Sequence, residues 1–433
     1  MKKIGVALLG CGVVGQAVYR ALAGQSASIA ARCGAVFEVK KIAVRNPKKK
    51  RDGIPAHLFT KSIAEAVAAP GVDIVVELMG GEEAAHKALL AAIRGKKHVV
   101  TANKLLLAKR GEEIFAEAVK AGVDIGFEAS VAGAVPVIRT LKEAVASGKV
   151  NSLFGIINGT SNYILTNMME KGVRFADALE EAQALGYAEA DPTFDVEGID
   201  AAHKLTILAS LAFGTPVSLR NVYVEGISRL APDDFRFARQ FGRVIKLLAT
   251  ARMDGGKLDV RVHPAMVNVN RPIARVDGVT NAVELDVSDA GRLMLIGPGA
   301  GGDATASAVV ADLADIARDM LSNSVGRIGP QGFLPQKRKK LAFKPIGDVS
   351  GGYYLRFTVD DKPGVLARMA GILGANGISI DSVIQKGRSG DPVPLVILTH
   401  EAKEKNIQTA IRKINQLPST RAKTMLIRLE NGG

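Results

Sequence analysis

Hydrophobic runs and helical periods alternate along the first third of the chain. Ile4 to Leu9 is a short apolar run, which a glycine-rich loop joins to a segment with helical spacing, QAVYRALA. Further apolar runs follow, and helices are predicted to about Arg94 and about Ala121. This alternation predicts an α/β domain with a doubly wound parallel sheet over residues 1–137, and a later helix, 304–325, is expected to pack back on it. The further predicted strands are Val36 to Val44, Asp73 to Gly80 and His98 to Lys104.

The rest of the chain has a different pattern. Residues 138–303 contain strand-like runs at 154–157, 257–267 and 279–287. A segment punctuated by proline and glycine, 326–350, is expected to be a linker. Residues 351–433 are predicted as strand, helix, two strands (ISIDSVIQK and VPLVILTH), helix and strand. This β-α-β-β-α-β order is typical of a ferredoxin-like α+β domain.

Composition limits the function classes. The chain has 433 residues, 47% hydrophobic and 23% charged, as expected of a globular protein of several domains. The sequence offers no apolar segment long enough to cross a membrane, and its apolar start lacks a signal-peptide cleavage pattern. Cys11 and Cys33 are its two cysteines. Such low cysteine usage suits a reducing compartment, so we expect a cytoplasmic protein without membrane partners.

The net charge of +14 suits phosphorylated ligands. Its visible clusters, Lys48 to Arg51 and Lys337 to Lys340, are not interleaved with aromatic residues, and tryptophan is absent. We therefore expect a nucleotide cofactor rather than a nucleic acid partner. Most of the charge is expected to be a solvated basic surface.

The loop GCGVVG follows the first predicted strand and opens a helix. In a dinucleotide-binding loop, Gly10 allows the tight turn, Gly12 lets the backbone approach a pyrophosphate, and Gly15 lets helix and strand pack closely. The helix N-terminus supplies N–H groups to the anion. The alternative is an ordinary glycine-containing turn. The expected cofactor-binding residues here are Gly10, Gly12, Val13, Val14 and Gly15.

The end of the second predicted strand is cationic. NAD-preferring domains commonly place an acid at this point, but here Arg45 follows the strand and Lys48 lies close after it. A cation suits the 2′-phosphate, so NADP is the expected cofactor, with NAD as the alternative. Thr101 and Lys104 lie past the carboxyl end of another strand, where α/β sheets bind ligands. Lys104 is read as an active-site residue or as a solvated loop lysine.

The stretch LGYAEADPTFDVEGIDAAHK, residues 185–204, is rich in carboxylates. From about Val196 the pattern predicts a helix, on which Asp200 and Lys204 share one face. Ile207 and Leu211 continue that face, so both charged side chains are expected to point inward. Such a pair is either structural or a site of proton transfer.

Three further segments are candidates for a pocket. Glu128 ends a strand, and its carboxylate among small residues is compatible with a cation held by backbone carbonyls. Asn158-Gly159-Thr160 is a polar turn entering a helix, which either lines a pocket or matches a glycosylation acceptor without consequence in the cytosol. Residues 297–303, GPGAGGD, are either a connector or a backbone segment that approaches the cofactor.

These motifs together resemble the homoserine dehydrogenases. The order from Ala182 to Lys204, with Gly186, Tyr187, Asp191, Pro192, Asp195, Gly198 and Asp200 at fixed spacing, matches that family's pattern at every specified position. GCGVVG, TANK, EASVAGAVP, NGTSNYIL and GPGAGGDATASAV resemble family segments in the same order. The resemblance covers residues 1–325 and implies a substrate-binding and dimerisation domain at 138–303.

The resemblance implies NAD(P)-dependent interconversion of L-homoserine and L-aspartate 4-semialdehyde, in threonine, methionine and isoleucine biosynthesis. It makes Lys204 the acid/base and places Lys104 beside substrate and nicotinamide. Glu189 and Asp200 would hold the substrate, and Gly186 and Gly302 would approach the cofactor. It also implies a sodium site, or one for another monovalent cation, formed by Glu128, Val131, Gly133 and Val135, and a homodimer or homotetramer.

The C-terminal domain, 351–433, resembles an ACT domain. Asp361-Lys362-Pro363-Gly364 stands at its first strand-to-helix turn. The resemblance implies feedback control, with L-threonine as the expected effector. The alternative is a ferredoxin-like domain that serves only in oligomerisation.

Two other functions were weighed. An acyl-phosphate-forming semialdehyde dehydrogenase needs a thiol nucleophile, but Cys11 lies in the phosphate loop and Cys33 precedes the second strand. A non-enzymatic nucleotide and amino-acid sensor would leave Glu189, Asp200 and Lys204 without a task.

Overall fold

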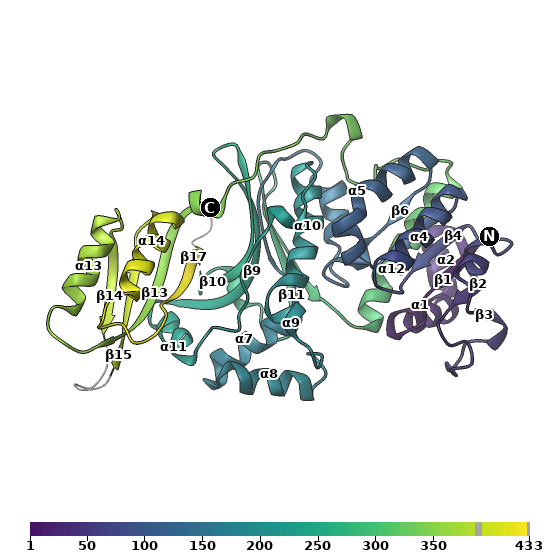
Figure 1. Cartoon of the computed structure of the whole chain (residues 1–433). Helices are drawn as coiled ribbons and strands as arrows, with labels where there is room; N and C mark the ends of the chain where they lie inside the picture. The colour runs from purple at the N-terminus through teal and green to yellow at the C-terminus, as the bar shows by residue number, and fades with distance from the viewer. Residues whose placement is uncertain (386–391, 431–433) are drawn as a thin grey trace. The chain divides into compact units, whose positions relative to one another are not determined.

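The computed structural model describes residues 1–385 and 392–430. It contains two compact units, each built from several stretches of chain (Figure 1). The first consists of Met1–Ile157, Ala202–Asn221 and Thr280–Lys340, and the second of Asn158–Ala201, Val222–Val279 and Leu341–Gly433. Across the described residues, none of the helices combines the length and the apolar character needed to cross a membrane.

The first unit contains a six-stranded parallel sheet with the order β3-β2-β1-β4-β5-β6. From Ile4 to Leu9 every residue of β1 is buried, as expected for a central strand covered on both faces. This confirms the predicted doubly wound sheet. The strands are β1 Lys2–Leu9, β2 Ala35–Ala43, β3 Phe59–Thr60, β4 Ile74–Glu77, β5 His98–Thr101 and β6 Ile125–Gly126. The accompanying helices are α1 Val13–Gly24, α2 Ser26–Cys33, α3 Ile63–Ala68, α4 Glu83–Arg94 and α5 Lys104–Ala121.

A helix from late in the sequence completes this layer. The segment expected at 304–325 forms α12, Gly302–Leu321, and its Val309 and Leu313 share one core with Ile4 and Val18. At Gly126 an added Cβ would lie 2.5 Å from the side chain of Asp312, so α12 packs directly against β6.

The first unit also contains an antiparallel group of strands in the order β12-β11-β7. The strand predicted from residue 154 begins earlier, at Val150, because the more polar residues at its start still pair with β11. The elements are β7 Val150–Ile156, β11 Thr280–Val287, β12 Gly291–Pro298, the short helix α6 Val137–Arg139 and the π-helical turn Thr140–Ala144. Single 3₁₀ turns occur in the two units at Ala56–Leu58, Glu128–Ser130, Leu219–Asn221, Pro272–Arg275, Pro335–Lys337 and Ile346–Asp348.

The helix predicted from Val196 is interrupted. Gly198 has φ +78°, a left-handed conformation that ends a short helix before the long one begins. These two helices are α9 Thr193–Val196 and α10 Ile199–Phe213.

The second unit has a long antiparallel hairpin formed by β9, Arg243–Asp254, and β10, Lys257–Asn268. Gly255 and Gly256 both have positive φ, which the tight two-residue hairpin turn requires. The short strand β8, Tyr223–Val224, runs parallel to β10. The other helices before residue 341 are α7 Gly159–Lys171, α8 Phe175–Ala184 and α11 Pro232–Gln240.

The C-terminal region has the predicted β-α-β-β-α-β order, with the four main strands arranged β17-β13-β15-β14. Residues of both helices share one core with the strands, so both cover the same face. Strand β17 also pairs in parallel with β10, which makes this sheet continuous with the β9–β10 hairpin. The elements are β13 Ser350–Asp360, α13 Val365–Ala375, β14 Ile380–Gln385, β15 Pro392–Thr399, β16 Ala402–Lys403, α14 Glu404–Asn415 and β17 Met425–Glu430. Lys386, the last residue of the predicted strand ISIDSVIQK, lies outside the described residues, as do 387–391 and 431–433.

The segment expected to be a linker is anchored to both units separately. In the first unit Arg338 is 9% exposed at its side chain and forms an ion pair with Glu112 at 2.6 Å. In the second, the N–H of Leu258 donates to the carbonyl of Ala342 at 2.8 Å. The expectation of a merely solvated basic cluster is therefore wrong for Arg338, because its charge is paired.

Candidate functional site

The glycine-rich loop has the geometry predicted for a phosphate loop. Gly10 has φ +101°, and an added Cβ would lie 2.6 Å from the carbonyl oxygen of Leu78. At Gly15 an added Cβ would lie 2.5 Å from the carbonyl oxygen of Gly10, so α1 packs tightly on the loop. At Gly12 the same test meets no described atom within 4 Å, which leaves room for a ligand at the helix N-terminus.

The second glycine-rich segment meets this loop. An added Cβ at Gly302 would lie 2.8 Å from the side chain of Val13, so the start of α12 contacts the start of α1. Val13 itself is 74% exposed, and Val14 is partly buried. The structure thus brings the predicted residues Gly302 and Val13 together, although they lie far apart in the sequence.

A cavity of about 710 Å³ adjoins the loop and has a basic wall. Arg45 lies in this wall, whereas Lys48 is exposed and outside the lining. The other cationic lining residues are Lys49, Arg51 and Lys61.

Arg51 has a structural task that the sequence did not reveal. Its guanidinium donates to the carbonyl oxygens of Cys11 at 3.0 Å and Lys49 at 2.9 Å, and it lies 5.0 Å from the ring centre of Phe59. Arg51 is therefore an exception to the solvated basic surface that the sequence predicts, because it ties the basic segment to the phosphate loop. The cavity, the open glycine and the cationic wall fit a phosphorylated dinucleotide.

The carboxyl end of β5 is ordered by a buried acid. Thr101 is fully buried and its hydroxyl donates to Glu77 at 2.7 Å, so the side chain points into the protein. Glu77 also accepts from the N–H of Met79 at 2.8 Å. Asn103 caps α5 by accepting from a main-chain N–H at 3.0 Å, which places Lys104 in the first turn of that helix, partly exposed.

Lys204 lies in the buried helix α10. Its side chain is 9% exposed, and its ammonium donates to the carbonyl oxygen of Ile157 at 2.7 Å. Residues 201–209 are all buried, so α10 is enclosed on every side. Asp200, in the first turn of the same helix, is 2% exposed. The prediction that both charged side chains point inward is confirmed.

In the second unit Asn158 holds two of the conspicuous carboxylates. Its amide nitrogen donates to Asp195 at 2.7 Å and to Asp200 at 2.8 Å. Its oxygen accepts from the N–H of Ser161 at 2.8 Å and caps α7. One side chain therefore fixes the turn before α10 and the acid that begins it.

The remaining predicted residues of this stretch lie at the surface of the second unit. Gly186 ends α8 with φ +75°, and Tyr187 stacks on Tyr163 with ring centres 4.9 Å apart. Glu189 is exposed, while its main-chain oxygen accepts from Gln183 at 3.0 Å. The carboxylate of Glu189 is therefore accessible to a ligand, while its backbone is held in place.

The loop after Glu128 is buried and tightly turned. Gly133 has φ +56°, and an added Cβ would lie 2.7 Å from the main chain of Gly299. The Glu128 carboxylate accepts from the N–H groups of Ile138 at 2.8 Å and Arg139 at 2.9 Å, so it caps the following helix. Burial raises the pKa of Glu128, against these hydrogen bonds, which lower it.

This loop limits how a cation would be held. Within the described part of the chain no group of three His, Cys, Asp or Glu side chains is arranged for a metal ion. Both oxygens of Glu128 already serve as helix cap. The carbonyl oxygen of Val135 accepts from Val137 at 2.8 Å, although a carbonyl can take a second partner. Each oxygen of Glu128 likewise keeps a further lone pair, so Glu128 and the main-chain oxygens of this loop are both candidate ligands for a cation.

Neither cysteine suits nucleophilic catalysis. Cys11 is 5% exposed and Cys33 is 4% exposed. Burial raises the pKa of Cys11, and nearby Arg51 offsets this only in part. A buried thiol of raised pKa is a poor nucleophile, which counts against acyl-phosphate chemistry.

Glu77 and Arg51 escaped prediction as parts of the site, and Asn158 was predicted only as part of a turn that could line a pocket. Glu77 could have been noticed as the acid that ends a buried apolar strand. Asn158 carried a signal, a polar residue before a glycine at a helix start, but its acidic partners were not foreseeable. Arg51 lies in a run of cationic residues, and nothing in the sequence distinguishes it from its neighbours.

Comparison with known proteins assigns the same regions to three families. The homoserine dehydrogenase NAD binding domain matches residues 10–128, and the homoserine dehydrogenase family matches residues 136–314. The ACT domain family matches residues 353–419.

Two individual relatives match over nearly the full length of this chain, and a third matches about three quarters of it. A homoserine dehydrogenase of Pseudomonas aeruginosa is 45% identical, over 99% of this chain and 99% of the relative. The crystal structure of a homoserine dehydrogenase from Thiobacillus denitrificans is 46% identical with a TM-score of 0.94, covering 100% of this chain and 99% of that one. A hyperthermophilic archaeal homoserine dehydrogenase in complex with NADPH is 27% identical with a TM-score of 0.62, covering 74% of this chain and 98% of that one.

Proposed function

This chain belongs to the homoserine dehydrogenase family, and we propose that it interconverts L-homoserine and L-aspartate 4-semialdehyde with NADP as its preferred cofactor. It is an oxidoreductase with a nucleotide-binding domain and a C-terminal ACT domain. The observation that carries the residue assignment is the buried helix α10, which has Asp200 in its first turn and contains Lys204.

The phosphate loop and its basic wall would hold the cofactor. Gly10, Gly12 and the first turn of α1 supply main-chain N–H groups to the pyrophosphate. Arg45 would bind the 2′-phosphate, which distinguishes NADP from NAD, while Arg51 holds the loop in place. When bound, the nicotinamide takes up or gives back the hydride.

The protein must then orient the substrate and move one proton. Asp200 and Glu189 would bind the ammonium group of homoserine, because two carboxylates complement one cation. Lys204, as a neutral amine, would accept the proton of the homoserine hydroxyl as the hydride leaves the carbon that carries this hydroxyl. In the reverse direction it would return the proton to the oxygen. Lys104, at the start of α5, would contribute a positive charge beside the substrate and favour the neutral form of Lys204.

A monovalent cation would bind the loop that follows Glu128. The main-chain oxygens of Val131, Gly133 and Val135 are its proposed ligands, and Glu128 would order the loop as a helix cap. Replacing Glu128 with Gln should keep one cap bond and weaken any dependence of activity on Na⁺. If the variant and the unmodified enzyme respond identically to Na⁺, the cation proposal is wrong.

The ACT domain suggests control by a small molecule, and we propose L-threonine, the end product of the pathway. The family resemblance supports a role in threonine, methionine and isoleucine biosynthesis and a homodimer or homotetramer, which are part of the same proposal. Threonine binding by calorimetry, combined with inhibition, separates feedback control from a domain that serves only in oligomerisation.

One experiment tests the core of the proposal. Purified protein is mixed with L-homoserine and either NAD or NADP, and the nicotinamide absorbance is followed with and without threonine. We expect homoserine-dependent reduction, with the higher kcat/KM for NADP. Absence of reduction with both cofactors would refute the proposed activity.

A further inference from the structure

The turn that precedes α10 packs on a short segment of the second unit, residues 225–227. The N–H of Ile227 donates to the carbonyl oxygen of Val196 at 2.8 Å. An added Cβ at Gly226 would lie 2.6 Å from that same oxygen, so no side chain fits between the two backbones. On the other side, an added Cβ at Gly198 would lie 3.3 Å from Val224 and 3.6 Å from the carbonyl oxygen of Glu225. The position of this segment therefore fixes the turn that leads into Asp200.

The segment is itself fixed to strand β10. The N–H of Glu225 donates to the carbonyl oxygen of Val262 at 2.8 Å, which continues the pairing of β8 with β10. This bond holds one end of the segment by its main chain. The side chain of Glu225 accepts from the hydroxyl of Tyr223 at 3.0 Å, and it also reaches a different element.

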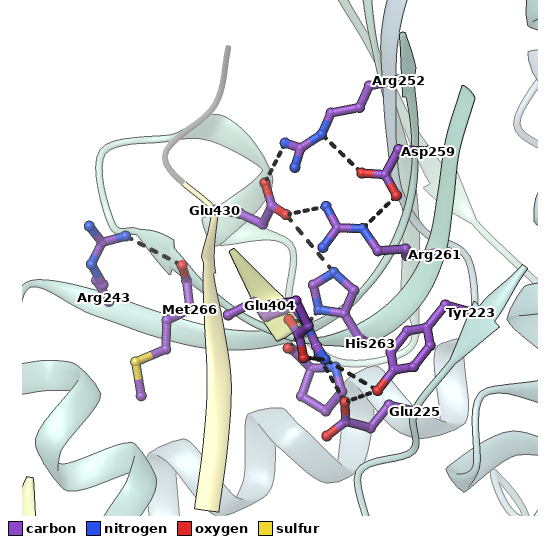
Figure 2. A network of polar contacts seen from close by, with 12 residues as sticks. Tyr223, Glu225, Arg243, Arg252, Asp259, Arg261, His263, Met266, Glu404 and Glu430 are labelled. Carbon is purple, nitrogen blue, oxygen red and sulfur yellow. Dashed lines mark hydrogen bonds and ion pairs between the residues drawn. The ribbon is translucent and has the colours of Figure 1, made fainter. Parts of the chain in front are cut away.

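Arg428, on the last strand of the ACT domain, contacts Glu225. Its guanidinium donates to Glu225 at 2.7 Å and to the hydroxyl of Tyr223 at 3.2 Å. The same guanidinium binds both oxygens of Glu404, at 2.7 and 2.9 Å. Figure 2 shows Tyr223, Glu225 and Glu404 converging on this point beside β10. Arg428 thus joins strand β17 and helix α14 to the segment that supports the substrate turn.

The cluster is buried enough to be rigid. The side chains of Arg428 and Glu404 are 4% and 3% exposed. Burial alone would raise the pKa of Glu404, but the charge and hydrogen bonds of Arg428 outweigh it and lower that pKa. A buried cation must keep its partners, because an unpaired charge in this surrounding is costly. Only a planar guanidinium binds two carboxylates in this way, so lysine is a poor substitute.

We propose that Arg428 is a positioning residue for substrate binding: through Glu225 it holds segment 225–227, against which the turn before Asp200 packs. The inference rests on the proposed role of Asp200 in holding homoserine. It gives the ACT domain a physical connection to the substrate turn within one compact unit. A disturbance of β17 or α14 then changes homoserine affinity and leaves the dinucleotide site unaltered.

A second arginine of the same domain, partly buried with its side chain 17% exposed, provides a matched control. Arg356, on β13 of the same domain, binds Asp234 at the start of α11 with bonds of 2.7 and 3.0 Å. Asp234 is fully buried and accepts from the N–H of Ala231 at 2.9 Å. This pair also ties the ACT domain to the rest of the unit, but its partners belong to α11 and not to segment 225–227.

The test compares Arg428→Lys, Glu225→Gln and Arg356→Lys in the full-length enzyme. We expect Arg428→Lys and Glu225→Gln to raise KM for homoserine about tenfold, the scale of one charge-assisted hydrogen bond, with KM for the nucleotide unchanged. All three variants should lower the melting temperature by similar amounts. Arg356→Lys, however, should leave KM for homoserine unchanged. Equal KM increases in all three variants would overturn the proposal, since they would reflect general loosening. An unchanged KM in Arg428→Lys and Glu225→Gln would overturn it as well.

The experiments distinguish a failure of the proposed activity from a failure of the positioning proposal. If the unmodified protein does not reduce nicotinamide with homoserine, the function itself is wrong. If it does, and Asp200→Asn leaves KM for homoserine unchanged, the role of Asp200 is wrong, and the positioning proposal is overturned with it.

Discussion

Buried His263 makes the stability of the second unit depend on pH near neutrality. The ring is fully buried on β10, with Nδ1 2.9 Å from the carbonyl oxygen of Pro264 and Nε2 3.9 Å from Glu430. Burial, and next the positive charges of Arg261, Arg428 and Arg252, lower its pKa well below 6.5. The folded protein therefore keeps this histidine neutral under conditions in which the unfolded chain protonates it.

The sign and size of the effect follow from this difference. Below the unfolded pKa of 6.5, the unfolded state binds one proton that the folded state does not, so stability falls as pH falls. Lowering the pH from 8 to 5 should cost about 2 kcal/mol of unfolding free energy through this residue alone. The stabilisation is fully present above neutral pH.

The assay is urea unfolding followed by circular dichroism at several pH values, for the unmodified protein and for His263→Gln. Groups common to both proteins cancel in the difference between the two curves. We expect the stability difference between them to shrink by about 2 kcal/mol from pH 8 to pH 5. A constant difference across this range would refute the reasoning, because it would mean that His263 titrates alike in both states.

Four other substitutions probe the sites directly. Gly10→Ala forces a Cβ to 2.6 Å from a main-chain oxygen at φ +101°, so NADP binding measured by calorimetry should weaken at least tenfold; unchanged affinity would contradict the loop geometry. Asn158→Ala removes the donor to Asp200, so KM for homoserine should rise about tenfold, and an unchanged KM would show that the acid needs no such support. Arg45→Ala should weaken the binding of NADP much more than that of NAD, and equal effects on the two cofactors would remove the 2′-phosphate argument. Arg51→Ala, which frees the loop, should weaken the binding of both cofactors.

Local patterns with a strong physical cause were predictable from the sequence. The phosphate loop follows from glycines that a tight turn and close packing of a helix require. The structure has the turn at Gly10, and at Gly15 the helix packs closely on the loop itself rather than on a strand. The inward direction of Asp200 and Lys204 follows from their spacing beside apolar residues. Both are buried as predicted.

Features that depend on long-range contacts were not predictable. Arg51 differs from its cationic neighbours only because the loop at Cys11 folds next to it. Glu128 serves as a helix cap because residues 138 and 139 turn back on it. The helix start was placed at Val196 because the apolar pattern continues through Gly198, whereas its left-handed conformation breaks the helix there. The contact of Arg428 with Glu225 joins residues 203 apart in sequence.

The central claim is that Lys204 transfers the proton between the substrate oxygen and the protein. Lys204→Met keeps most of the apolar side chain and removes the amine. Turnover of homoserine should fall at least about 100-fold, the lower range for a general acid/base, while NADP affinity and the melting temperature stay unchanged. Near-normal kcat in Lys204→Met would contradict this assignment.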